Sequence, residues 1–293
     1  MSFRLFLWLE KILMKFSHKK RKHFFIFLSN IARKISKKTR KVVEINLKFV
    51  FGDNYPQDKI DEITEYSFRN LLLNFLHLME IRHMSKEDLE KKVNIQNLQV
   101  VDKIHKDGRA IVYITAHYGA WELAGASVGA FIEPLGAVYK RMKNKDYEQW
   151  VLDSRAHFGN VNLEKTNVMK KLIRRIKNKQ AIGILIDTKI PKKDGILVEL
   201  FDKKISQTAA ASFLARKFNA AIVPVIMVSD DEENYTLQIF DEISIEYSDN
   251  VEDDITKLTQ LQASWLESII KKEPKFWFWL HRRFKGEYPE IYK

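Results

Sequence analysis

The sequence predicts an α/β protein with a mixed, largely parallel sheet flanked by helices, preceded by an N-terminal helical extension that associates with a membrane. Two patterns lead to this prediction. Six short apolar runs between residues 110 and 245 alternate with amphipathic stretches, as strands and crossover helices do. The excess positive charge is instead confined to the beginning of the chain. A hydrophobic content of 45% is ordinary for a folded protein and excludes a largely disordered one.

Charge separates residues 1–52 from the rest of the 293-residue chain. The whole sequence has a formal net charge of +12. Residues 1–52 hold fourteen Lys or Arg and two acids, Glu10 and Glu44, so they carry that entire excess. Proteins that bind nucleic acid more often spread positive charge over the folded domain. We therefore predict a neutral body, residues 53–293, and a basic segment that serves a partner other than nucleic acid.

Residues 2–16, SFRLFLWLEKILMKF, fit a basic amphipathic helix. At 100° per residue, Arg4, Lys11 and Lys15 share one narrow sector, and most of the remaining circumference is apolar. This pattern is typical of a helix that lies in a membrane interface. No apolar run approaches the roughly 20 residues that span a bilayer, and no small-residue cleavage site follows, so we expect neither a spanning helix nor a signal peptide. The alternative is a soluble helical hairpin that packs its apolar faces on the body.

The body is expected to form one domain. Residues 53–106 have helical periodicity, with a long helix from Asp58 to Met84. We expect strands at 110–116, 135–140, 181–187, 195–201, 221–228 and 235–245, and helices near 120–131, 143–157, 167–178, 207–218 and 251–272. Pro224 lies inside the run 221–228 and has no N–H to donate, so we expect that strand to be at a sheet edge or bulged.

The stretch 110–130, AIVYITAHYGAWELAGASVGA, is the best candidate for a catalytic site. His117 directly follows a strand, Gly119 permits a tight turn, and Glu122 falls in the first turn of the next helix. Glu122 could accept a hydrogen bond from Nδ1 of His117 and leave Nε2 free to take a proton. A second strand delivers Asp187, and we expect His117 and Asp187 at the same edge of the sheet, where open α/β sheets bind ligands.

These residues belong to a set of motifs that resembles the lipid A secondary acyltransferases of the lysophospholipid-acyltransferase-like superfamily. HYGAWE at 117–122 resembles the H-x-x-x-x-E motif, and the segment from Arg155 to Gly159 resembles R-x-x-x-G. VYKRMKN, the block around Asp187, and FWFWLHRRFK at 276–285 resemble later family blocks, so the resemblance covers roughly residues 1–286. One departure is Thr188, where the family usually has Gln after the aspartate.

The resemblance implies transfer of a fatty acyl chain from acyl carrier protein to a hydroxyl group of a lipid A precursor. His117 would then be the general base and Glu122 would orient it. Arg155, or backbone amides from Gly119 onward, would stabilise the oxyanion or bind a substrate phosphate. Asp187 would position Arg155 or the sugar, and Arg141, Arg282 and Arg283 are further phosphate candidates. The enzyme would need no metal and no cofactor except the phosphopantetheine of acyl carrier protein.

The same resemblance implies peripheral or monotopic attachment to the cytoplasmic face of the cell inner membrane. Two other hypotheses remain open. One is acylation of another membrane glycolipid, such as a phosphatidylinositol mannoside. The other is a non-catalytic basic protein that binds a membrane or nucleic acid through residues 1–52. The absence of cysteine excludes a disulfide framework, a thiolate metal site and a cysteine nucleophile.

Overall fold

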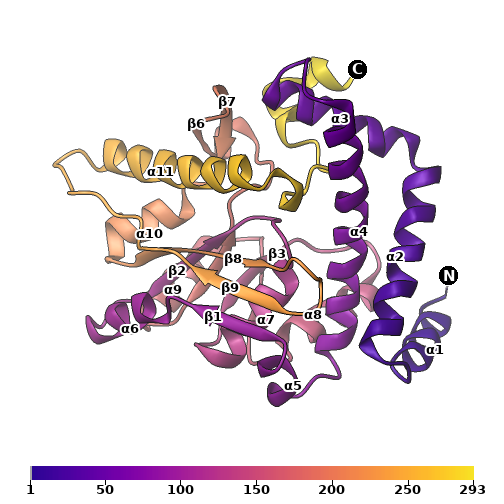
Figure 1. The fold of residues 1–293 in the computed structure, drawn as a ribbon. Coiled ribbons are helices and arrows are strands. Elements are labelled where there is room, and N and C mark those ends of the chain that lie inside the picture. Colours follow the sequence, from indigo (N-terminus) through magenta and orange to yellow (C-terminus); the bar gives the residue numbers. More distant parts are fainter. Residues whose placement is uncertain (1) are drawn as a thin grey trace.

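A seven-stranded sheet forms the centre of the protein in the computed structural model, which describes residues 2–293 (Figure 1). Its order is β1-β9-β8-β2-β5-β3-β4, and every neighbouring pair is parallel except β8–β9. The strand bounds are β1 Val93–Gln96, β2 Ile111–Thr115, β3 Gly136–Tyr139, β4 Val161–Glu164, β5 Ile182–Leu185, β8 Ala221–Val228 and β9 Tyr235–Ile239. The predicted mixed, largely parallel sheet flanked by helices is therefore confirmed.

Helices cover both faces of this sheet. Alternate residues of β2 divide between two cores: Val112 and Ile114 face a core shared with α9, α10 and α11, whereas Ile111 and Tyr113 face one shared with α5, α6 and α7. The bounds are α5 Lys86–Glu90, α6 Leu98–Lys106, α7 Trp121–Phe131, α8 Lys145–Ala156, α9 Val168–Lys177, α10 Ala210–Phe218 and α11 Val251–Lys272. A separate antiparallel hairpin, β6 Ile196–Leu200 and β7 Lys203–Gln207, packs on α11.

Two expectations about strands were wrong. β1 lies in a region predicted to be helical, because its short VNIQ segment adds to the open edge of β9, a long-range pairing with no helical-period signal. The strand that contains Pro224 is central, not at an edge, and lies between β2 and β9. It tolerates proline because Pro224 is the last residue aligned with β2, and pairing with β9 begins at Val225. Strands β4 and β7 were not predicted.

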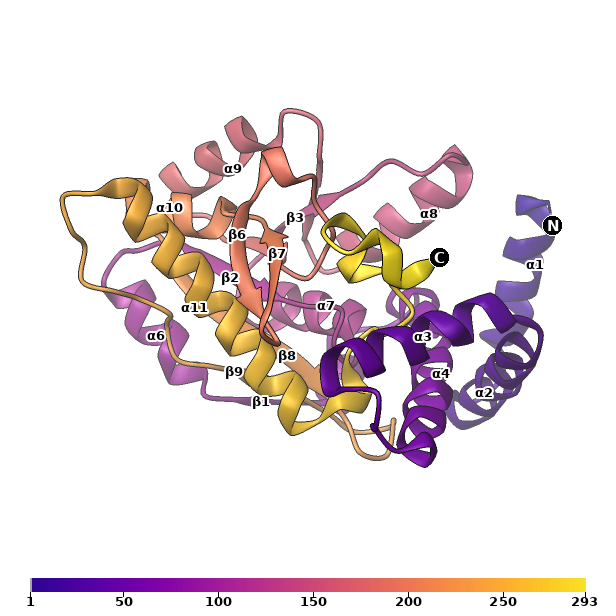
Figure 2. The ribbon, with the colours of Figure 1, turned by 90° about the horizontal axis from the view of Figure 1, so that it is seen from above.

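The N-terminal helices α1 Phe3–Leu13, α2 His18–Ile35 and α3 Lys37–Phe51 lie beside the long helix α4 Gln57–Ile81 (Figures 1 and 2). Phe6 and Phe25 are buried in an apolar cluster with Leu76 of α4 and Trp150 of α8. One face of this segment therefore packs on the body. No described helix, from residue 2 to the C-terminus, is both long and apolar enough to cross a bilayer. The division of the chain at residue 52 stays a prediction.

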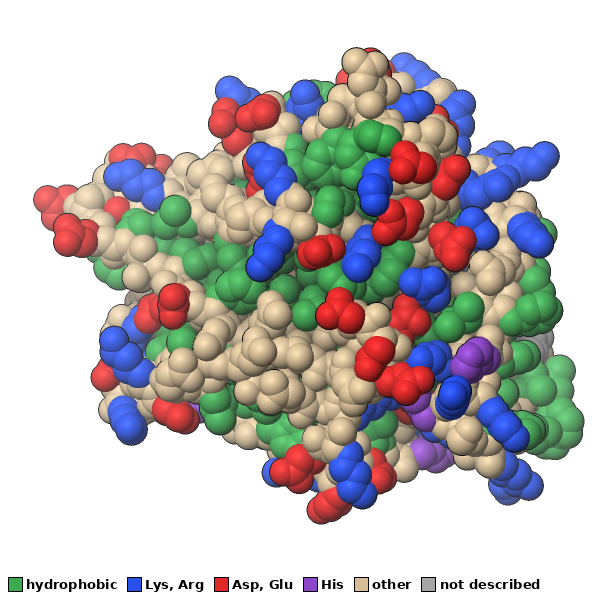
Figure 3. Space-filling view, viewed as in Figure 1, with side chains coloured by type: hydrophobic (Ala, Val, Ile, Leu, Met, Phe, Trp, Pro, Cys, Tyr) green, Lys and Arg blue, Asp and Glu red, His purple; other side chains and the backbone are tan. Residues whose placement is uncertain are grey.

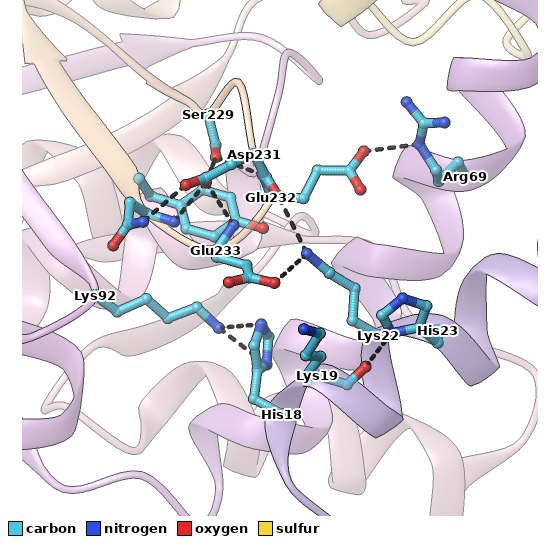
Figure 4. A network of polar contacts seen from close by, with 12 residues as sticks. His18, Lys19, Lys22, His23, Arg69, Lys92, Ser229, Asp231, Glu232 and Glu233 are labelled. Carbon is cyan, nitrogen blue, oxygen red and sulfur yellow. Dashed lines mark hydrogen bonds and ion pairs between the residues drawn. The ribbon is translucent and has the colours of Figure 1, made fainter.

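A polar network also holds α2 against the body (Figure 4). Lys22 forms an ion pair with Glu233 at 2.6 Å and donates to the carbonyl oxygen of Asp231, both in the β8–β9 loop. From α4, Arg69 pairs with Glu232 of the same loop at 2.7 Å. Part of the basic charge of residues 1–52 is thus used within the fold.

Candidate active site at the carboxyl edge of the sheet

His117 lies just beyond the end of β2, in a sharp turn that leads into α7. Gly119 in this turn has φ +57°, and a Cβ there would overlap the carbonyl oxygen of Met227 in the neighbouring strand β8. Only glycine satisfies both conditions without strain. The backbone N–H of Gly119 donates to Phe276 and that of Ala120 to Met227, each at 2.9 Å. The turn is therefore fixed from two sides, and it holds the His117 side chain at the sheet edge.

Asp187 holds the imidazole of His117. Because Thr115 and Leu185 are paired in the parallel strands β2 and β5, residues two positions beyond each strand end lie side by side. Nδ1 of His117 lies 3.0 Å from Oδ1 of Asp187, and the backbone N–H of His117 donates to Oδ2 at 2.9 Å. A carboxylate only accepts hydrogen bonds, so Nδ1 carries the proton and Nε2 presents a lone pair. The expected convergence of these two residues is confirmed.

The electrostatics of this pair favour proton binding by His117 and ionisation of Asp187. Burial acts to lower the pKa of His117, but Asp187, and to a lesser degree Glu122, outweigh it, so the pKa is raised above 6.5. Burial acts to raise the pKa of Asp187, but His117 and the indole N–H of Trp277 outweigh it, so that pKa is lowered. His117 therefore accepts a proton more readily than an ordinary histidine.

Glu122 does not make the contact that the sequence analysis assigned to it. Its carboxylate binds Arg155 of α8 at both oxygens, with Nε–Oε2 at 2.9 Å and Nη2–Oε1 at 2.6 Å. The expected roles are thus exchanged: Asp187 holds His117, and Glu122 holds Arg155. The reason is geometric, because Glu122 lies in the first turn of α7, a helix that contacts α8, whereas Asp187 lies in register with His117.

Two asparagines of α4 hold the turn between β2 and α7 in place. The side-chain amides of Asn70 and Asn74 both donate to the carbonyl oxygen of Gly119 at 3.0 Å, and Oδ1 of Asn74 accepts from the backbone N–H of Glu122 at 3.2 Å. The contact between Oδ1 of Asn74 and the N–H of Glu122 caps α7, whose own N-cap residue Ala120 has no side-chain acceptor. Sequence reasoning missed both residues, although two polar side chains four positions apart on the apolar face of a helix are a recognisable signal.

The C-terminal aromatic segment closes the site from the other side. The indole N–H of Trp277 donates to Oδ2 of Asp187 at 3.1 Å, and the backbone N–H of Phe278 donates to the carbonyl oxygen of His117 at 2.9 Å. The Phe278 ring lies 5.8 Å from the imidazole. Asn46 of α3, buried to 1% exposure, anchors this segment by donating to the carbonyl oxygens of Trp279 and His281. The sequence indicated this aromatic run only as a family motif and did not predict its contacts with Asp187 and His117.

Two pockets flank His117. The first has a volume of about 110 Å³ and is mainly apolar; it lies between α7 and strands β2, β3 and β5, with Trp121, Glu122 and Arg155 among its lining residues. Small residues such as Gly125 and Gly183 leave the space. The second, about 100 Å³, is lined by His117, Asp187, Thr188, Trp277, Phe278, His281 and Arg283. The imidazole lines the second pocket and lies 5.2 Å from the Trp121 ring of the first.

The remaining candidates are placed differently. The amide of Gly119 is already bonded to Phe276, so this residue has a structural role in the turn and offers no donor to an oxyanion. Arg141 is exposed and pairs with Glu164, and Arg282 is exposed beside the Tyr292 ring. Arg283 is buried and donates to the carbonyl oxygen of Ser206. Within residues 2–293, no cluster of three or more His, Asp or Glu is arranged to hold a metal ion.

Comparisons with known proteins identify the family of the chain. The family model described as "Bacterial lipid A biosynthesis acyltransferase" matches residues 2–286. The chain is 23% identical over 261 residues to the lipid A biosynthesis palmitoleoyltransferase of Escherichia coli K12, covering 87% of this chain and 81% of that one. It is 20% identical over 268 residues to the lauroyltransferase of the same organism, covering 88% and 83%. It is also 21% identical to a lipid A biosynthesis acyltransferase of Haemophilus influenzae, covering 86% and 79%.

Proposed function

Because the chain belongs to the bacterial lipid A biosynthesis acyltransferase family, we propose that it transfers a fatty acyl chain from acyl carrier protein to a hydroxyl group of a lipid A precursor. This is a secondary acylation in lipopolysaccharide biosynthesis. The observation that carries the proposal is the His117–Asp187 pair, which lies beside an apolar pocket at the carboxyl edge of the sheet. A base next to an apolar slot is what hydroxyl attack on a long-chain thioester requires.

The proposed reaction starts with proton transfer from the acceptor hydroxyl to Nε2 of His117. The oxygen attacks the thioester carbon and forms a tetrahedral oxyanion, which collapses with cleavage of the C–S bond. The imidazolium returns the proton to the departing thiolate. Asp187 holds the imidazole in the tautomer that leaves Nε2 free, and it stabilises the imidazolium. The acyl donor is carried on phosphopantetheine, and the proposal includes no other cofactor and no metal.

Arg155 is our candidate for stabilising the oxyanion. Nε and Nη2 of its guanidinium bind Glu122, and among the described residues Nη1 has no partner, so it can serve a ligand. Arg155 lines the apolar pocket, and its positive charge is felt by His117. A fixed cation at the mouth of a pocket stabilises developing negative charge more than water does. Glu122 would then act by fixing Arg155 rather than His117.

The apolar pocket is our candidate site for the acyl chain. A cavity of about 150 Å³ holds one benzene ring, so a pocket of about 110 Å³ accepts only part of a long chain as it stands. We propose that the chain length preferred by the enzyme depends on how far this pocket opens when the acyl chain enters.

We also propose that the N-terminal helices bind the cytoplasmic face of the inner membrane, peripherally or as a monotopic anchor. Phe24, Phe27, Ile31 and Ile35 share one face of α2 by their spacing and are all exposed, Ile35 to 75%. Trp8 of α1 is 58% exposed. Figure 3 shows apolar and basic side chains together along the edge formed by α1 and α2. Apolar groups that insert, next to cations worth about 1 kcal/mol each against anionic lipid, fit an interfacial surface.

The decisive experiment supplies the purified chain with acyl carrier protein thioesters of several lengths and a tetra-acylated lipid A precursor. We expect one added acyl ester by mass spectrometry. No transfer with any thioester would contradict the proposal.

The alternatives predict different outcomes. Deletion of the gene should remove one secondary chain from lipid A; intact lipid A together with loss of a chain from another glycolipid would favour the second acceptor class. The function of a non-catalytic binding protein would not depend on the His117–Asp187 pair, so it would be retained in His117→Ala. It would fail instead when Lys19 to Lys22 are reversed in charge.

A further inference from the structure

Six lysines lie on the connections that follow two neighbouring strands of the sheet, close to the candidate site. Three follow β3, and three follow β5 and Asp187. They are Lys140, Lys143, Lys145, Lys189, Lys192 and Lys193, and we call them the basic rim. Since β3 and β5 are adjacent and parallel, both loops leave the same edge of the sheet. Val138, the next-to-last residue of β3, and Leu185, the last residue of β5, line the apolar pocket, so the basic rim begins within a few residues of it.

The lysines of the basic rim have no charged partner within the described structure. All six lysines are exposed, and within the described chain none of them forms an ion pair or a side-chain hydrogen bond. The segments 140–145 and 189–193 contain no acidic residue. Arg141 is the one residue of these segments with an ion-pair partner in the described structure, Glu164. A cluster of unpaired like charges raises the energy of the folded state through self-repulsion, and it attracts an anionic partner to this part of the surface.

The composition of the basic rim fits a protein better than a membrane. A membrane-binding surface combines cations with apolar side chains that insert, as α1 and α2 do. In segments 140–145 and 189–193, Met142 is the one large apolar side chain that is exposed. The two surfaces also lie on different segments: the exposed apolar side chains of the first are on α1 and α2, whereas the basic rim lies on the connections after β3 and β5 and ends at Lys145, the first residue of α8.

We infer that the basic rim is the docking surface for the acidic protein that delivers the acyl thioester, separate from the surface that binds the membrane. The inference rests on the proposed function, because it locates the binding surface for the protein that carries the acyl donor of that reaction. A protein docked there places its flexible thioester arm at the mouth of the apolar pocket, beside His117. Charge complementarity of this kind mainly raises the rate of encounter, by tenfold to a thousandfold, and weakens with salt.

The test reverses charge in each half of the basic rim: Lys140→Glu/Lys143→Glu/Lys145→Glu and, separately, Lys189→Glu/Lys192→Glu/Lys193→Glu. We expect each triple variant to lower kcat/KM for acylated acyl carrier protein at least about tenfold and to flatten its salt dependence. With acyl-pantetheine, a donor that lacks the protein, kcat/KM should stay within about twofold. Direct binding of holo-acyl carrier protein to the variants, followed by fluorescence anisotropy, should weaken in parallel without any turnover.

The matched control is Lys34→Glu/Lys37→Glu/Lys38→Glu in the N-terminal segment, with the same change in net charge. It should reduce binding to anionic vesicles and leave carrier-protein binding unchanged. Equal losses with both donors, or equal effects of the control on carrier-protein binding, would overturn the inference. Normal transfer from the carrier protein in both rim variants would also overturn it and leave the proposed function intact. If no donor supports transfer in the wild-type chain, the proposed function itself fails.

Discussion

Two buried carboxylates of this protein each hold a histidine, in almost the same way. Glu80 accepts from Nδ1 of His18 at 2.7 Å, and Asp187 from Nδ1 of His117 at 3.0 Å. The imidazoles are 28% and 29% exposed, and the carboxylates 3% and 4%. The contact distances and exposures of the side chains alone do not distinguish the two pairs.

The surroundings separate them. Glu80 also binds Arg21 at 2.9 Å and Lys92 at 3.2 Å, and Nζ of Lys92 lies within 3.4 Å of both ring nitrogens of His18. Asp187 receives only neutral donors besides the imidazole, and no described Lys or Arg nitrogen lies within ion-pair distance of it. Its charge therefore acts on His117, whose side chain lines a pocket and whose Nε2 has no hydrogen-bond partner in the described structure. A histidine–carboxylate contact indicates catalysis only when one ring nitrogen is left for a substrate.

Among the variants of the two pairs, we expect Asp187→Asn to have the largest effect on kcat. Asparagine can donate to Nδ1 and so favours the wrong tautomer, with the proton on Nε2. We expect kcat with acyl carrier protein to fall about 10²- to 10⁴-fold, and the melting temperature to change little. The corresponding change at the other pair, Glu80→Gln, should leave kcat per folded molecule unchanged. Equal losses of kcat in the two variants would remove the distinction between the pairs.

Glu80→Gln should instead act on stability. The change leaves Lys92, whose pKa is already lowered by burial, and Arg21 without their anionic partner. Breaking a buried ion network from one side costs about 3–5 kcal/mol of unfolding free energy. Urea unfolding followed by circular dichroism measures the loss. A loss below about 1 kcal/mol would show that this network does not hold α2 to the body.

A change inside the apolar pocket should alter chain-length preference. Gly125 lines the pocket, and a Cβ added there meets no heavy atom within 4 Å, so a larger side chain projects into open space. We expect Gly125→Leu to lower kcat/KM for the longest accepted chain about 10- to 200-fold, with a smaller effect on shorter chains. The control Gly125→Ala should keep the preference and gain about 0.5–1 kcal/mol of helix stability. An unchanged length profile in Gly125→Leu would place the acyl chain elsewhere.

The pH profile gives the smallest but most specific effect. Since Asp187 and Glu122 together outweigh burial and raise the pKa of His117, the base should lose its proton only above pH 6.5. The rate should therefore rise with pH through a midpoint above 6.5. Asp187→Asn removes the larger of the two raising contributions, so its residual activity should have a lower midpoint. A midpoint equal to or above that of the wild type would contradict the electrostatic account.

What could be predicted from the sequence depended on how local the signal was. The positions of His117 just after β2 and of Asp187 just after β5 follow from two apolar runs, and the convergence of the two side chains follows from parallel pairing. The exchange of Glu122 and Asp187 could not be predicted, because it depends on strand register and on where α8 lies. The contributions of Asn74 and Trp277 arise from contacts across 48 and 90 residues of sequence, which local periodicity does not report.

The central claim is that the imidazole of His117 takes the proton from the acceptor hydroxyl. Its most direct test is the single-turnover rate of acyl transfer in His117→Ala, with saturating acyl carrier protein thioester and lipid A precursor. The account predicts a rate at least about a hundredfold below wild type, with an unchanged melting temperature and unchanged carrier-protein binding. A rate within about threefold of wild type in a folded variant would contradict it.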